Sequence, residues 1–261
     1  MKRFVLAMGI SLLAAFFCFS CGGGGSEGSS VGNLQGIWLG VIEDDAGTLE
    51  EFSLQIDGSG NIIEVTIGKT STGDTGHINE GWDENLFYVR YDSGGSGIMI
   101  VDDQYSHATY GDYGALGISD FYCGVLEKGA TTLPPVPAFA SSDIVGSYPV
   151  GGAYVFTYDS SAGEYDWEGE AISMTVNSDL TFSGSSQADS FSGGFDALLR
   201  NPTYGGYAGT LTRDTTLPKT LDIKALVSPD KTFVAAYAKG IGTPPTSVSY
   251  THLTLPTTPY V

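Results

Sequence analysis

Basic residues are scarce in this chain of 261 residues. Lys and Arg number 11 against 30 Asp and Glu, which gives a formal net charge of −19 at pH 7. Proteins that bind nucleic acid carry clustered basic residues, so this composition excludes a nucleic-acid partner. The acidic excess favours solubility and repels anionic surfaces, and we expect the acidic groups in solvated loops.

Cysteine is rare as well. The three cysteines are Cys18, Cys21 and Cys123, and the first two lie in or beside an N-terminal apolar segment. Cys123 therefore has no intramolecular disulfide partner, and in the apolar segment 122–126 we expect it to behave as a small buried side chain. Hydrophobic cores, and not disulfides, must then stabilise the fold.

Helical periodicity is missing after residue 20. No window of about 11–18 residues places apolar side chains at helical spacing, and we expect a single helical turn, over Ser192 to Arg200. The 37 glycines, 15 tyrosines and 13 phenylalanines are typical of many short strands separated by turns.

Motifs for catalysis and metal binding are absent too. The sequence GGSG at residues 94–97 does not match the Gly-x-Ser-x-Gly motif of serine hydrolases, and the turn 57–61 lacks the spacing of a calcium loop. Nothing selects a carboxylate pair for glycoside hydrolysis from the 30 acids. His77 and His107 have no ligand spacing, and we expect them at the surface or in turns. The sequence therefore predicts no enzymatic activity, no catalytic residue, no metal ion and no cofactor.

The N-terminus resembles a bacterial lipoprotein signal. A short basic region and an apolar run over residues 4–19 precede Ser20 and Cys21, and the run is short for a helix that spans a membrane. The resemblance implies cleavage before Cys21, lipid on its sulfur, and the membrane as a partner through that lipid. Gly22 follows the cysteine in place of Asp, which resembles an outer-membrane destination. We expect a lipid-anchored protein of the cell envelope.

The other end of the chain resembles translated sequencing-adapter DNA. The residues VSYTHLTLPT, from Val248 to Thr257, can be written back as the transposon adapter used for short-read libraries. Residues 248–261 are therefore expected to be adapter-derived and are left out of the fold prediction, and His252 is given no role. We also expect the natural chain to continue beyond Ser247.

Two stretches of the chain open and close alike, which predicts a duplicated domain. LQGIW at residues 34–38 and IVGSY at residues 144–148 share the pattern aliphatic-x-Gly-x-aromatic. Apolar strands then run into Lys-Gly at residues 128–129 and 239–240. A Thr/Pro stretch follows each Lys-Gly, and such segments act as stiff spacers.

Alternation of apolar and polar residues predicts strands in both copies. Residues 52–56 alternate before the turn 57–61 and residues 62–67 return, as in a hairpin. Residues 172–176 and 180–182 predict a second hairpin. Further strands are expected at residues 85–91, 97–102, 115–119, 120–126, 152–158, 207–212, 220–226 and 231–238.

The tripeptide Gly36-Ile37-Trp38, followed by antiparallel strands, resembles the opening of lipocalin-like small barrels. The resemblance implies an all-β fold of two tandem small antiparallel β-barrels, with the Trp38 indole across the floor of the first. The second copy departs from this pattern, with Gly146-Ser147-Tyr148 in the same place. Two β-sandwiches of similar strand number are the alternative.

The expected domain boundaries follow from these features. They are a signal peptide at 1–20, a Gly/Ser linker at 21–32, a first β-domain at 33–129, a Thr/Pro linker at 130–142, a second β-domain at 143–240, a linker at 241–247 and the adapter-derived tail at 248–261.

Two functions fit this organisation. The one we expect is that the barrels bind a small apolar or glycan ligand in a lined cavity of roughly a few hundred Å³. Trp82, Phe87, Tyr88 and Tyr91 are then either core residues or part of the ligand surface. The alternative is a structural or interaction protein of the envelope, with filled barrels, no ligand, and a patch or edge strand that contacts other envelope proteins.

Overall fold

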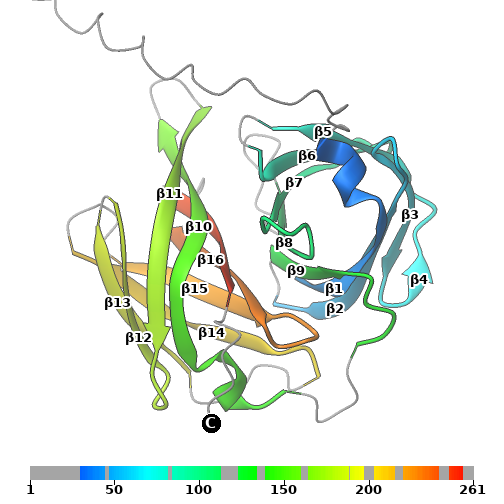
Figure 1. The fold of residues 1–261 in the computed structure, drawn as a ribbon. Helices are drawn as coiled ribbons and strands as arrows, with labels where there is room; N and C mark the ends of the chain where they lie inside the picture. Colours follow the sequence, from blue (N-terminus) through cyan, green and yellow to red (C-terminus); the bar gives the residue numbers. More distant parts are fainter. Residues whose placement is uncertain are drawn as a thin grey trace, which may run out of the picture.

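The computed structural model describes residues 30–44, 47–81, 84–112, 123–133, 139–159, 164–187, 189–196, 203–214, 220–240 and 247–254. In these ranges the regular structure consists of strands and two short 3-10 helices, arranged as two curved sheets side by side (Figure 1). The expected all-β class is confirmed. No helix in the described part of the chain is long and apolar enough to cross a membrane.

The first sheet curls around its own core. Its described strands follow the order β2-β1-β9-β8-β7-β6-β5-β3-β4, and β2 also pairs with β3, so that the pairing returns to its start. The 3-10 helix η1 precedes it. The bounds are η1 (Ser30–Leu34), β1 (Gly36–Glu43), β2 (Leu49–Ile56), β3 (Asn61–Ile67), β4 (Thr70–Ser71), β5 (Gly76–Glu80), β6 (Leu86–Tyr91), β7 (Ser96–Val101), β8 (His107–Asp112) and β9 (Cys123–Lys128).

The second sheet is a closed antiparallel barrel. Strands β10 to β17 follow one another in chain order, and β17 pairs back with β10. This closure rules out a sandwich in this half of the chain. The β10–β11 hairpin extends beyond the neighbouring strands (Figure 1). The bounds are η2 (Ser141–Ile144), β10 (Gly146–Asp159), β11 (Glu164–Val176), β12 (Thr181–Ser186), β13 (Ser190–Phe195), β14 (Gly206–Arg213), β15 (Thr220–Val227), β16 (Phe233–Gly240) and β17 (Ser247–Thr254).

The closing strand β17 lies in the tail that the sequence analysis leaves out of the fold. Strand β17 pairs with both β10 and β16, and Leu253 is buried in the core. In the structure residues 247–254 are thus part of the barrel, and without them β10 and β16 would each present an open edge. The adapter resemblance of residues 248–261 stays a prediction about the origin of the sequence.

Strand β17 also changes the correspondence between the two copies. In the first sheet, β9 pairs directly with β1 and places Lys128 opposite Trp38. In the second, β17 separates β16, which carries Lys239, from β10. The repeated Lys-Gly pattern aligned β9 with β16, whereas the pairing order makes β17 the counterpart of β9.

Most predicted strands coincide with observed ones. Phe52, Leu54 and Ile56 are buried on one side of β2, and the hairpins β2–β3 and β11–β12 form at the predicted turns. The predicted helical turn over residues 192–200 is wrong in its described part, because residues up to Phe195 form β13 and pair with β12 and β14. Residues 197–200 lie outside the described residues. The predicted strand at 115–119 lies outside the described residues.

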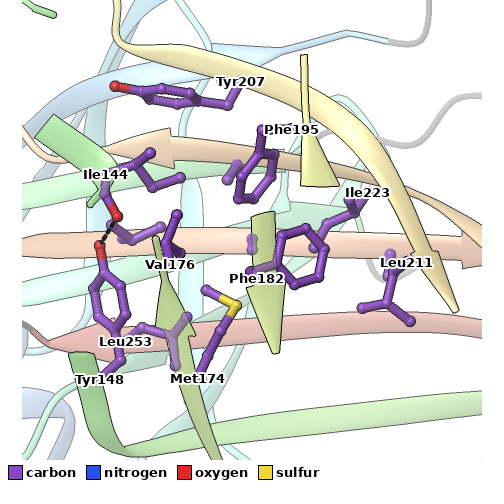
Figure 2. Packing of buried hydrophobic residues seen from close by; sticks show 14 of the residues in the cluster. Ile144, Tyr148, Met174, Val176, Phe182, Phe195, Tyr207, Leu211, Ile223 and Leu253 are labelled. Carbon is purple, nitrogen blue, oxygen red and sulfur yellow. Dashed lines mark hydrogen bonds between the residues drawn. The ribbon is translucent and has the colours of Figure 1, made fainter. Parts of the chain in front are cut away.

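Each sheet opens with the same structural element. Trp38 Nε1 donates to the Leu34 carbonyl at 2.8 Å, and Tyr148 Oη donates to the Ile144 carbonyl at 2.7 Å (Figure 2). Both aromatic side chains are fully buried. A large ring thus fills the core while its polar atom satisfies a main-chain carbonyl of the preceding 3-10 helix. The repeated aliphatic-x-Gly-x-aromatic pattern encodes this element.

Apolar side chains fill both interiors. In the second barrel one continuous cluster includes Phe182, Phe195 and Tyr207, with ring centroids 4.9 and 5.9 Å apart (Figure 2). In the first sheet a second cluster includes Phe52 and Tyr110, whose centroids are 5.2 Å apart. Among the described residues, these side chains pack against one another inside each barrel.

A third buried cluster joins the two sheets through their outer faces, and we call it the inter-barrel interface. It comes from β1, β2, β6, β7 and β9 of the first sheet and from β15 and β16 of the second. Ile98 and Ile100 of β7 belong to it, whereas Met99 belongs to the interior. Strands buried on both faces carry continuous apolar residues. The fit is close, since a Cβ on Gly206 would lie 2.6 Å from Leu49 Cδ1.

The segment between the two sheets packs against both. Leu133 lies against the inter-barrel interface, and Phe139 is buried in the core of the second barrel. Lys231 Nζ lies 5.3 Å from the centroid of the Phe139 ring. The two barrels therefore form one packed unit, held by the interface and by both described ends of the linking segment.

Candidate functional site

Two groups of charged side chains lie where the barrels meet, and the first is a buried ion pair. Glu43, the last residue of β1, has a side chain with 0% exposure, and Lys224 Nζ of β15 lies 2.6 Å from its Oε1. Cys123 is buried nearby, as expected. Burial and the charge of Glu43 raise the pKa of the Cys123 thiol, which disfavours the nucleophilic thiolate form.

The second group surrounds His107, the first residue of β8. Its Nδ1 lies 3.2 Å from Asp102 Oδ2, and its Nε2 lies 3.0 Å from Asp230 Oδ2. Asp102 precedes β8 in the first sheet, whereas Asp230 lies in the turn between β15 and β16. The imidazole also stacks on Phe233, with ring centroids 5.2 Å apart and planes 13° from parallel. His107 therefore bridges the two barrels.

Glu127 on β9 completes this group, which we call the His107 cluster: His107, Asp102, Asp230 and Glu127. Strand pairing places Glu127 opposite His107, and its Oε2 accepts the Asp230 main-chain N–H at 3.2 Å. One ligand-type atom from each of His107, Glu127 and Asp230 lies within 4.8 Å of the other two. The cluster combines three carboxylates with one imidazole.

The turns that carry the two aspartates hold their side chains in place. Asp230 Oδ1 accepts the Thr232 N–H at 3.0 Å, and its Oδ2 accepts the Thr232 hydroxyl at 2.6 Å. Asp102 Oδ1 accepts the Ser106 N–H at 2.7 Å, and its Oδ2 accepts the Ser106 hydroxyl at 2.7 Å. Hydrogen bonds within each turn therefore orient both carboxylates independently of their contacts with His107.

The electrostatics follow from this geometry. Burial lowers the pKa of His107, but its hydrogen bonds to Asp102 and Asp230 and their charges outweigh burial and raise it to about 9. Burial opposes ionisation of Asp102, yet hydrogen bonds from His107 and Ser106 lower its pKa to about 2. Burial and the charge of Asp230 raise the pKa of Glu127. The cluster thus holds a charged imidazole and an excess of negative charge.

Ser106, His107 and Asp102 together supply the residue types of a hydrolytic triad, yet their geometry differs from that of a triad. In a triad the acid orients one ring nitrogen and the nucleophile contacts the other. Here Ser106 Oγ and Asp102 Oδ2 both lie beside Nδ1, at 3.0 and 3.2 Å. The carboxylate of Asp230 contacts the other ring nitrogen, Nε2, where the nucleophile of a triad would lie. The arrangement therefore places a charged imidazole between carboxylates from both barrels.

The structure separates the two histidines that the sequence treats alike. His77 on β5 is exposed, as expected. The surface or turn position expected for His107 is wrong, because the second barrel covers it and its side chain is 13% exposed. Asp230 lies 123 positions away in the sequence, so spacing carried no signal. The acidic turn before residue 107 was the local hint.

The aromatic residues that the sequence grouped as core or ligand surface, from Trp82 to Tyr91, lie in different environments in the structure. Phe87 is buried in the first interior, and Tyr91 Oη lies 3.0 Å from Tyr110 Oη. Tyr88 packs against the inter-barrel interface, and Trp82 lies outside the described residues. An open depression of about 490 Å³ is lined by residues 88–91 and 94–96.

The expected lipidation site, Cys21, lies outside the described residues.

No family model matches the chain, and no curated protein matches it in sequence. Among solved structures, it is similar to transferrin binding protein B from serogroup B Neisseria meningitidis, with a TM-score of 0.43, 10% identity, and 82% of this chain and 43% of that chain covered. It is also similar to a transferrin binding protein B mutant from Haemophilus parasuis, with a TM-score of 0.41, 8% identity, and coverage of 83% and 44%. A protein of unknown function from the DUF3598 family of Nostoc punctiforme matches with a TM-score of 0.34, 10% identity, and coverage of 88% and 98%. The chain spans less than half the length of the transferrin binding proteins that it matches.

Proposed function

We propose that this chain is a lipid-anchored, non-catalytic protein of the bacterial envelope whose two barrels act as one unit that binds other envelope proteins. The observation that carries the proposal is that, among the described residues, buried apolar side chains fill the interior of each barrel. Of the two functions that fit the sequence, this filling favours the interaction protein over a barrel that encloses a small apolar or glycan ligand.

The other parts of the proposal rest on different residues. The lipoprotein-like signal and Cys21 support anchoring in the envelope, because several acyl chains bind a bilayer firmly at about 0.8 kcal/mol for each buried methylene. The state of Cys123 and His107 supports a non-catalytic role. The thiol of Cys123 is buried with a raised pKa, and both ring nitrogens of His107 face carboxylates.

Native mass spectrometry tests the anchor and the filled interiors together. Protein extracted from the envelope in mild detergent is expected to have the mass of the chain from Cys21 onward plus lipid, with no small molecule retained in stoichiometric amount. Cys21→Ser is expected to lose the lipid mass. An apolar or glycan compound retained at one per chain would restore the ligand-binding alternative, and an unmodified Cys21 would remove the anchor.

The outer surface offers one place where a partner is expected. Among the described residues, the large apolar side chains that are exposed are Ile37 and Ile63, each at 48%. They lie on β1 and β3, on either side of β2: Ile37 pairs with Gln55, and Ile63 precedes Glu64, which pairs with Gln55 from the other side. A photo-crosslinking residue at position 63 is expected to trap an envelope protein in intact cells. The same residue at exposed Thr210 of β14 is the control, and equal trapping at both positions would argue against a specific contact.

A further inference from the structure

We infer that His107, Glu127 and Asp230 form a binding site for one divalent transition-metal ion of the zinc class, which joins the two barrels. The three side chains come from β8, β9 and the β15–β16 turn, and their ligand atoms lie within 4.8 Å of one another. This site lies between the barrels and outside their interiors. It is independent of the proposed interaction function, which stands or falls on other measurements.

The donor set fits such an ion. Zinc binds imidazole nitrogen and carboxylate oxygen at about 2.0–2.2 Å, and sites with three protein ligands leave a fourth position to water. Around a tetrahedral ion with bonds of about 2.1 Å, the ligand atoms are roughly 3.4 Å apart. His107 Nε2 and Asp230 Oδ2, at 3.0 Å, already approach that spacing. The third ligand, the Glu127 carboxylate, has an oxygen within 4.8 Å of the ligand atoms of both other residues.

Asp102 supplies the outer support that metal-binding histidines have. Such histidines donate the N–H of their second ring nitrogen to a carboxylate or carbonyl, which fixes the tautomer and orients the ring. Asp102 Oδ2 lies 3.2 Å from His107 Nδ1, and Ser106 holds that carboxylate in place. Phe233 stacks on the ring from the second barrel. The imidazole is therefore oriented with Nε2 toward Glu127 and Asp230.

The charges of the cluster are balanced by an ion of this kind. Asp102, Asp230 and Glu127 place three carboxylates around one imidazole, and a ligand-type oxygen of Asp230 lies within 4.8 Å of one of Glu127. The metal takes the place of the proton on His107 Nε2, which passes to the solvent. A divalent cation between the carboxylates then offsets their repulsion.

The ligand number distinguishes the zinc class from calcium. Calcium takes about 6–8 oxygen ligands and does not favour imidazole. The proposed site, made of His107, Glu127 and Asp230, offers one nitrogen and two carboxylates, with the Thr232 hydroxyl 3.3 Å from His107 Nε2. Imidazole is a preferred ligand of zinc and of neighbouring transition metals. We therefore expect Zn²⁺ and Co²⁺ to bind and Ca²⁺ to bind far more weakly.

The test uses the full chain dialysed against a chelator. Titration calorimetry with Zn²⁺ is expected to show one ion per chain, and Co²⁺ is expected to give the visible absorption of four-coordinate cobalt. His107→Asn and Glu127→Gln are expected to abolish both signals. Asp102→Asn is expected to weaken the affinity by about 10–100-fold. His77→Asn, on exposed β5, is the matched control and is expected to bind as the natural sequence does.

Glu127→Gln keeps the test decisive if other variants fold poorly. Glu127 accepts a main-chain N–H, and the substitution leaves the contacts of His107 with Asp102 and Asp230 intact. The proposal is overturned if Zn²⁺ binds this variant and the natural sequence equally, or if Co²⁺ gives no absorption with the natural sequence. In either case His107 would only form ion pairs with Asp102 and Asp230 and would bind no metal ion.

Discussion

Lys224→Met is expected to lower the free energy of unfolding by about 3–5 kcal/mol. Lys224 is the cation 2.6 Å from the fully buried carboxylate of Glu43. Without it, a carboxylate is left in an apolar interface that includes Val41 and Val125. Removing one partner of a buried pair is more damaging than replacing both, because the remaining charge has lost its solvent and its counterion. Urea denaturation followed by fluorescence measures the change.

Two comparisons make this result specific. The double variant Glu43→Met with Lys224→Met is expected to recover most of the loss, since apolar residues of similar volume suit the interface. Lys69→Met is the matched control, because Lys69 pairs with Glu51 at 3.6 Å but is 75% exposed. An exposed pair contributes about 0–1 kcal/mol. If Lys224→Met were no more harmful than Lys69→Met, the buried pair would not stabilise the barrel contact.

Trp38→Ala is expected to cost about 3–5 kcal/mol of the free energy of unfolding, because it removes a fully buried indole and leaves a cavity. The indole lies in the core of the first sheet with 0% exposure. Its Nε1 donates to the Leu34 carbonyl at 2.8 Å, so the substitution also leaves that carbonyl without its side-chain donor. Thermal unfolding followed by circular dichroism reports the loss.

The neighbouring residue provides the control. Ile37 precedes Trp38 in β1, points to the opposite face and is 48% exposed. Ile37→Ala is expected to change stability by about 0.5 kcal/mol or less. Equal effects at the two positions would show that the ring of Trp38 does not hold the core. Tyr148→Ala applies the same reasoning to the second barrel, where the ring occupies the equivalent place.

The sequence predicts the local elements of this fold well, because their signals lie within a few residues. Alternation in β2, the turn at Asp57 and the aliphatic-x-Gly-x-aromatic openings each depend on short-range chemistry. Strand β17 was missed because its residues were judged by their resemblance to adapter DNA and not by their alternation. The helical turn at Ser192 failed because its glycine-rich sequence pairs with strands on both sides.

The contact between the barrels could not be predicted in the same way. The apolar runs at residues 97–101 and 233–238 show that both faces of a strand are buried, but they do not show what covers the outer face. Glu43 and Lys224 are far apart in the chain, as are His107 and Asp230. Their pairing depends on how two complete sheets dock, so no spacing rule detects it.

The inter-barrel interface has a consequence for the order of synthesis. The ribosome makes β7 and β9 well before β15 and β16. Until β15 and β16 are made, the apolar surface formed by Ile98, Ile100 and Val125 stays exposed. Exposed apolar surfaces of this kind cause aggregation during folding. A gene that ends before β15 would leave this surface exposed permanently. We therefore expect a fragment that ends before β15 to aggregate, and the pair of barrels to remain in solution.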